Sequence, residues 1–186
     1  MDDKLLKFAY DMAFRDATLR NAFIKYKSDE SEESDEHFRS RKKLIRDGAF
    51  NDVKKYIDLI FAGCKPDPLE TIICISDKFR EKGFSFGNAQ KLVNMTSKYM
   101  YLTTYYVKDS KELFENCHCP MDSIMIDVVK KMSNTYKYKD ISWSRLDVID
   151  NKIPQEYNDF QTEIVKLSKE EGCIPIEFDY LFWDNE

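Results

Sequence analysis

Hydrophobic residues recur every three or four positions along most of this 186-residue chain, which is the spacing of one face of a helix. The first such segment, residues 2–27, predicts one long helix or two short ones. Further helices are predicted over residues 37–47, 50–62, 68–82, 87–106, 120–134 and 154–171, with a short one near Trp143. The pattern therefore predicts a chain built from helices.

Turn-forming residues separate these segments. Gly48 is expected to end the first basic helix, and Asn51 to cap the helix that follows. Pro68 and Pro120 suit a first helical turn, because the N–H that proline lacks has no partner there in any case. The helix that Pro120 opens would carry Asp122 in its first turn, where the helix dipole favours a carboxylate.

The composition agrees with a helical fold. Hydrophobic residues make up 42% of the chain, which is enough for a packed core, and there are only five glycines and five prolines. All-β proteins need many turn residues, so this scarcity favours helices. We therefore expect an all-α fold with a single compact multi-helix domain over residues 1–186. Its aromatic C-terminal segment, 172–186, is expected to pack back onto the body.

Charge is distributed unevenly along the chain. Residues 1–36 have a net charge of −4, residues 37–136 of +5, and residues 137–186 of −6. The acidic run SDESEESDE at 28–36 is expected to be a solvated loop. An acidic protein is a poor general nucleic-acid binder, but the basic middle leaves local binding open.

The five cysteines bear on the compartment and on metal binding. Their odd number, the lack of a signal peptide and the lack of a long apolar run predict a cytoplasmic protein with reduced thiols and no membrane span. The Cys-His-Cys sequence at 117–119 lacks the second cluster that structural zinc sites use. We therefore expect neither a metal nor a cofactor.

The predicted helix 87–106 carries a stripe of polar and aromatic residues. Most lysines on helices belong to a solvated face, but Lys91 is flanked by Leu92 and Val93, which favours partial burial. Burial penalises the charged form of an amine, and a neutral amine is a nucleophile. The residues of this stripe, three or four positions apart, are Lys91, Asn94, Lys98, Tyr101 and Tyr105.

The segment from Phe84 to Val129 resembles the core of the helix-hairpin-helix DNA glycosylase superfamily. The likeness rests on Gly87, Gln90-Lys91, Asn94 and Lys98, followed after a connection by CPMDSIMIDVV. The spacing of 31 residues between Lys91 and Asp122, and the second lysine one helical stretch on, are most similar to the archaeal 8-oxoguanine DNA glycosylases.

This resemblance implies a base-excision enzyme that acts on nucleic acid, with Lys91 and Asp122 as its catalytic residues. An extruded nucleotide would lose its base, Asp122 would stabilise positive charge on the sugar, and Lys91 would form a Schiff base that permits strand cleavage. Residues that would contact the substrate are Gln90, Asn94, Lys98, His118 and Trp143.

Two other hypotheses stay open at this point. The chain could be a non-enzymatic helical protein from a phage or mobile element, which binds a basic partner through its acidic surface. It could also be a nuclease, although only His37 and His118 are available for histidine catalysis. The enzymatic hypothesis requires Lys91 and Asp122 to face one cleft, rimmed by the basic side chains of 37–55. The binding hypothesis requires Lys91 to point to bulk water, with Asp122 only capping its own helix.

Overall fold

The computed structural model describes residues 2–19, 22–26, 32–105, 110–138, 140–150 and 152–183. These residues form eight α-helices and two short 3₁₀ helices, with no strand among them, so the predicted all-α fold is confirmed. The helices are α1 (Asp3–Ala17), α2 (Asp35–Phe61), α3 (Pro68–Phe79), η1 (Arg80–Lys82), α4 (Phe86–Thr104), α5 (Ser110–Leu113), α6 (Ser123–Met132), η2 (Trp143–Arg145), α7 (Gln155–Glu170) and α8 (Pro175–Phe182).

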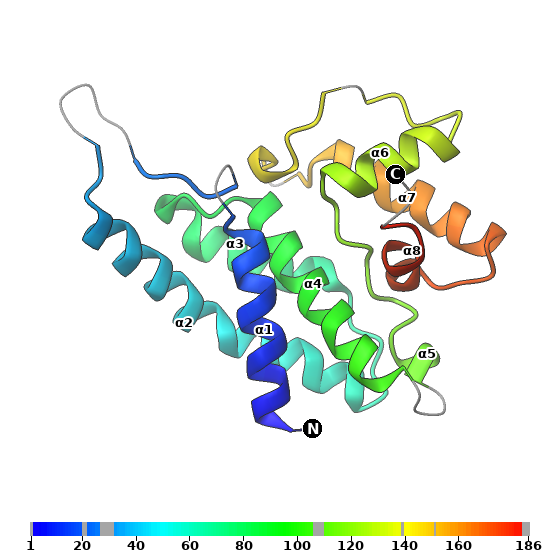
Figure 1. Cartoon of the computed structure of the whole chain (residues 1–186), viewed down its shortest axis with the longest axis horizontal. Coiled ribbons are helices and arrows are strands. Elements are labelled where there is room, and N and C mark those ends of the chain that lie inside the picture. Colours follow the sequence, from blue (N-terminus) through cyan, green and yellow to red (C-terminus); the bar gives the residue numbers. More distant parts are fainter. Residues whose placement is uncertain are drawn as a thin grey trace.

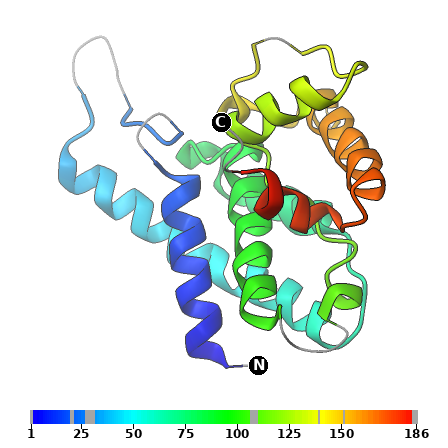
Figure 2. The same ribbon diagram turned by 45° about the vertical axis from the view of Figure 1, so that its right-hand side comes forward.

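Helix α4 is the centre of the molecule. Helices α1, α2 and α3 pack on one side of it, and α6, α7 and α8 form a second group on the other side (Figure 1). The turned view separates the two groups again, with α4 between them (Figure 2). Because both groups bury its surface, α4 is covered nearly all round, including the polar stripe that contains Lys91 and Asn94.

Helix α2 corrects two predictions about its boundaries. It runs without a break through Gly48, so the expected stop at this residue and the expected cap at Asn51 are wrong. A methyl group at position 48 would lie 2.7 Å from the ring of Phe79, so this glycine lets α2 and α3 approach closely. The helix begins after Ser34, whose hydroxyl accepts a hydrogen bond from the His37 N–H at 3.2 Å.

The acidic run 28–36 is only partly a loop. Residues 28–31 lie outside the described ranges, but Asp35 and Glu36 form the first turn of α2. The Glu33 carboxylate is buried and accepts hydrogen bonds from the Arg41 guanidinium at 2.6 and 3.0 Å. The loop prediction is therefore wrong for Asp35 and Glu36, which are helical, and the expected solvation is wrong for the Glu33 carboxylate.

Most other helix predictions are confirmed. The segment 68–82 forms α3 and η1, and 87–106 and 154–171 correspond closely to α4 and α7. The C-terminal segment folds as α8, and its residues Ile176 and Phe178 are fully buried against the body. The first helix is shorter than residues 2–27, because α1 ends at Ala17. Among the described residues, no helix has both the length and the hydropathy that crossing a membrane requires.

Candidate functional site

The site is built around Lys91, in the N-terminal half of α4. The helix starts with a capping box, in which the Ser85 hydroxyl accepts from the Asn88 N–H at 3.1 Å and the Asn88 side chain accepts from the Ser85 N–H at 3.0 Å. Lys91 follows on the next turn and is only 6% exposed. Its Nζ contacts the Asp122 carboxylate and lies 5.7 Å from the ring centroid of Trp143.

The Asp122 carboxylate is held from two directions. One oxygen accepts a hydrogen bond from the Met125 N–H at 2.9 Å, which makes Asp122 the N-cap of α6, and the other contacts Lys91. Helix α6 therefore starts at Ser123, and the prediction that Pro120 opens it is wrong by one turn. The N-cap position fixes the carboxylate where the free N–H groups favour negative charge.

Two glutamine side chains hold the segment before α6. Gln90 of α4 donates to the Met121 carbonyl at 2.8 Å and accepts from the Met121 N–H at 3.1 Å. Gln161 of α7 makes the same pair of bonds with Cys119, at 2.8 and 3.2 Å. Each amide side chain thus satisfies both backbone groups of one buried residue, and together they fix the backbone that leads to Asp122.

Asn94 and His118 belong to the same hydrogen-bond network. The Asn94 side chain donates to Gln90 Oε1 at 3.2 Å and to the Tyr157 hydroxyl at 3.0 Å. That hydroxyl lies 2.9 Å from His118 Nδ1. Burial lowers the pKa of His118 to about 4, so the ring is neutral near pH 7 and shares a hydrogen bond with the Tyr157 hydroxyl.

A groove of about 750 Å³ lies next to the Lys91–Asp122 pair. Leu19 and Ala22 line it on one side, Ser123 at the start of α6 on another, and residues 141–145 on the third. Trp143 lines this groove and its ring also lies over Lys91, whereas neither Lys91 nor Asp122 is among the described residues that line it. We call this hollow the Trp143 groove.

Gly87 explains how Trp143 reaches this position. A methyl group at position 87 would overlap the Trp143 carbonyl oxygen and lie 3.0 Å from the Ser144 Cα. The Gly87 N–H donates to the Leu146 carbonyl at 2.9 Å. The absent side chain therefore lets η2 and its flanking residues pack directly on the start of α4.

Lys98 takes part in a second ion pair. Its Nζ contacts the Asp179 carboxylate of α8 and lies 6.0 Å from the ring centroid of Trp183. Burial raises the pKa of Asp179, and the positive charge of Lys98 opposes this shift. Each lysine of the α4 stripe is thus paired with a carboxylate and lies close to a tryptophan ring.

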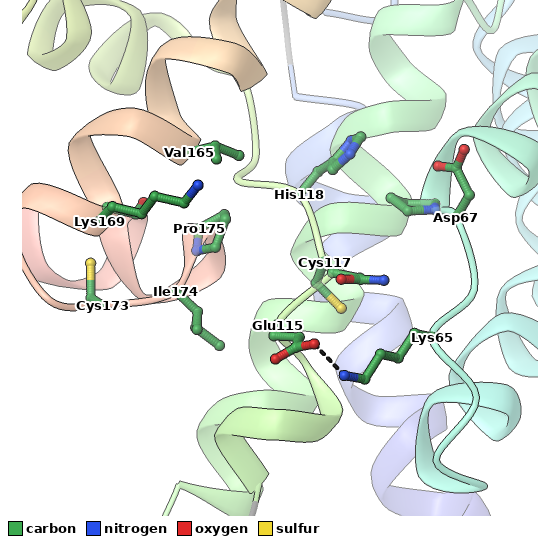
Figure 3. Close-up of a pocket in the computed structure, with 13 residues that line it drawn as sticks. Lys65, Asp67, Glu115, Cys117, His118, Val165, Lys169, Cys173, Ile174 and Pro175 are labelled. Atoms are coloured by element: carbon green, nitrogen blue, oxygen red, sulfur yellow. Dashed lines mark hydrogen bonds and ion pairs between the residues drawn. The ribbon is translucent and has the colours of Figure 1, made fainter.

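His118 also faces a different hollow, of about 540 Å³, between residues 115–118, the loop before α3, α7 and α8 (Figure 3). Two of the groups that line this hollow are poorly placed for catalysis. Lys65 is paired with Glu115, and Cys117 lies in the buried wall, 3.6 Å from the Tyr56 hydroxyl. Burial raises the pKa of the Cys117 thiol to about 12, so it is not a thiolate near pH 7.

The basic residues of 37–55 are not where the enzymatic hypothesis expects them. Arg39, Lys42, Lys43 and Arg46 line a hollow between α1 and α2. Within the described ranges, none of them lines the Trp143 groove. The expected basic rim around the Lys91 cleft is therefore wrong. Helix α2 packs mainly on α1 and α3 and contacts α4 little, so its solvent-facing basic residues lie away from the Trp143 groove.

Three residues of the site were missed by the sequence analysis. Tyr157 and Gln161 are polar groups four residues apart on the buried face of α7, beside Phe160 and Ile164. Asp179 is an acidic residue within an aromatic run. A polar residue at a core position of a predicted helix indicates a buried hydrogen bond, and this was the signal available in the sequence. It does not identify the partner, because the partner comes from a distant segment.

The comparisons with known proteins give no relatives: no family model, no curated protein and no solved structure matches this chain. In the part of the chain that the structure describes, no group of three or more His, Cys, Asp or Glu side chains is arranged to hold a metal ion.

Proposed function

We propose that this protein removes a base from nucleic acid and then cleaves the strand as a lyase, with Lys91 as the nucleophile. The observation that carries the proposal is the buried contact between the Lys91 amine and the Asp122 carboxylate, next to the Trp143 groove. A fixed carboxylate beside a desolvated amine can accept its proton and, once that proton has been passed on, can stabilise positive charge. The same two residues carry the resemblance to helix-hairpin-helix DNA glycosylases.

The proposed reaction begins with proton transfer from Lys91 to Asp122. The free Nζ electron pair then forms a bond to C1′ of the extruded sugar, while the C1′–N bond breaks and its electron pair leaves with the base. The base takes up the proton held by Asp122, which restores the carboxylate. The sugar ring opens to a Schiff base on Lys91. Loss of the C2′ proton expels the 3′ phosphate, and water finally hydrolyses the imine and restores the amine.

Trp143 has two roles in this proposal. In the unbound protein its ring lies over Lys91, so residues 141–145 must move before a sugar can reach the amine. After this movement the ring offers a flat surface on which an extruded base can stack. The Lys98–Asp179 pair and Trp183 supply a second set of polar and aromatic groups along the same stripe of α4.

The alternative of a non-enzymatic binding protein has less support. It requires a lysine in bulk water and a carboxylate that only caps its helix, whereas Lys91 is 6% exposed and Asp122 makes both contacts. The acidic run that this hypothesis uses to bind a basic partner contributes Glu33 to an ion pair within the protein. These observations favour the enzymatic proposal.

Borohydride trapping tests the proposal directly. The protein is incubated with duplexes that carry an abasic site or an oxidised purine, and sodium borohydride is added to reduce any Schiff base. We expect a covalent adduct with the wild type, no adduct with Lys91→Met, and at least tenfold less with Asp122→Asn.

Lys65→Met is the matched control, because Lys65 is also paired with a carboxylate but lies in the other hollow. It should trap as well as the wild type. If the wild type forms no adduct on any of these substrates, or Lys91→Met still forms one, the proposed function is wrong.

A further inference from the structure

The basic hollow between α1 and α2 collects positive charge in an otherwise acidic protein. It has a volume of about 410 Å³, and among the described residues that line it the only acidic one is Asp11, which is already paired with Lys7. Its floor is formed by Phe14 and Thr18. The cations that line it are Arg15, Arg39, Lys42, Lys43 and Arg46.

Three of these cations form no salt bridge with a carboxylate within the described ranges. Lys43 and Arg46 share the carboxylate of Asp47. In contrast, Arg15 and Arg39 are exposed, and neither forms a salt bridge there, although the charge of Arg39 acts on Asp35. The Lys42 amine lies 3.3 Å from the Thr18 carbonyl oxygen, and partial burial lowers its pKa. An anion in the hollow would thus gain charge contacts without breaking existing ion pairs.

The spacing of the cations suits a polyanion with regular charges. Positions 39, 42, 43 and 46 lie on one face of α2, and the seven steps of 1.5 Å from Arg39 to Arg46 span about 10 Å. One strand of a duplex carries a phosphate about every 3.4 Å along the helix axis, so this face spans about three phosphates. Arg15 faces them from α1.

The turn after α1 joins the hollow to the proposed catalytic site. Thr18 lines the basic hollow, and its neighbour Leu19 lines the Trp143 groove. The Asn88 side chain donates to the carbonyls of Ala17 and Ala22, each at 2.8 Å, and so fixes this turn to α4 three residues before Lys91. A strand that crosses the turn can therefore reach both hollows.

We propose that the basic hollow binds the sugar-phosphate backbone of the nucleic acid, on the strand that places its target nucleotide at Lys91. This assignment rests on the proposed function for the identity of the polyanion. The charges themselves do not depend on the chemistry at Lys91, so binding and catalysis can be tested separately.

The test measures binding to a labelled duplex with a tetrahydrofuran abasic-site analogue, which cannot form a Schiff base. Fluorescence anisotropy is recorded over a series of salt concentrations for the wild type and for the double variant Arg15→Gln/Arg39→Gln. Each lost phosphate contact reduces the slope of log K against log[salt] by about 0.9. We therefore expect a slope smaller by about 2 and a weaker affinity at low salt.

The matched control is Lys4→Gln/Lys55→Gln, which removes two exposed lysines from the same helices. Lys4 is 11 residues from Arg15 and Lys55 is 16 residues from Arg39, or roughly 16 and 24 Å along each helix. It should change the slope far less. Equal slopes for the two double variants would overturn the proposal. It would also be overturned if the wild type bound polyglutamate through this hollow but did not bind the duplex.

The trapping experiment distinguishes this proposal from the proposed function. A reduced slope without any borohydride adduct would keep the binding site and reject the lyase. An adduct with an unchanged slope in Arg15→Gln/Arg39→Gln would keep the lyase and reject the binding site.

Discussion

At the scale of single residues, the Lys91–Asp122 pair couples stability to the proposed chemistry. Asn is a good N-cap, so Asp122→Asn should keep α6 but leave the buried Lys91 without its counter-charge. Breaking a buried ion pair on one side costs about 3 kcal/mol. We expect urea denaturation of Asp122→Asn to show a loss of that order.

A double-mutant cycle checks whether this loss comes from the pair. Lys91→Met removes the buried charge itself, so Lys91→Met/Asp122→Asn should be more stable than the sum of the single effects predicts, by at least 1 kcal/mol. Strictly additive effects would mean that the two side chains do not interact in the folded protein.

Gln161 allows a second prediction at the residue scale. Gln161→Leu removes both hydrogen bonds to Cys119 and leaves a buried N–H and a buried carbonyl without partners. Each such group costs about 1–3 kcal/mol, so the free energy of unfolding should fall by roughly 3 kcal/mol. Gln155→Leu is the control, because Gln155 bonds only to Asp159 at the surface. Equal effects of the two substitutions in urea denaturation would contradict the role of Gln161.

At the scale of elements, the packing of η2 on α4 depends on Gly87. Gly→Ala inside a helix usually stabilises a protein by about 0.5–1 kcal/mol. Here the added methyl group overlaps the Trp143 backbone, so Gly87→Ala should instead destabilise the protein and displace residues 142–146. Lys91, which lies beneath Trp143, should then be reductively methylated several times faster, as measured by mass spectrometry of its peptide.

Gly48→Ala separates this effect from a general loss of stability. Its methyl group meets the ring of Phe79 between α2 and α3, which lies apart from η2. Methylation of Lys91 should therefore stay at the wild-type rate. A Gly87→Ala protein with wild-type stability and wild-type methylation would show that η2 does not cover the amine.

At the scale of the whole molecule, the sequence predicted the helices better than their partners. Apolar periodicity is local, so it located α3, α4 and α7 closely. The prediction that Gly48 ends a helix failed, because this glycine lies inside α2 and makes room for the Phe79 ring of α3. The family resemblance singled out Lys91 and Asp122, and the structure brings them into contact. Gln161 could not be predicted, since its partner Cys119 lies 42 residues away in sequence. Long-range polar contacts are set by the packing, which no local pattern contains.

The buried network around His118 gives the molecule a specific pH dependence. Burial lowers the pKa of His118 to about 4 in the folded protein, although the charge of Asp67 opposes this, while an unfolded histidine has a pKa near 6.5. The unfolded chain therefore binds more protons between pH 4 and 6.5, and stability is lost as the pH falls through that range. The full shift corresponds to about 3 kcal/mol. Because His118 borders a hollow and is only partly shielded from solvent, we expect a loss of roughly 2 kcal/mol.

His118→Gln keeps a hydrogen-bonding side chain beside Tyr157 but removes this titration. Urea denaturation at pH 4.5 and 7.5 should thus show a smaller pH-dependent loss for His118→Gln than for the wild type. His37→Gln removes an exposed histidine and should behave like the wild type. If the wild type and His118→Gln lost equal stability on acidification, the folded protein would tolerate a charged imidazole at position 118, contrary to the effect expected from its burial.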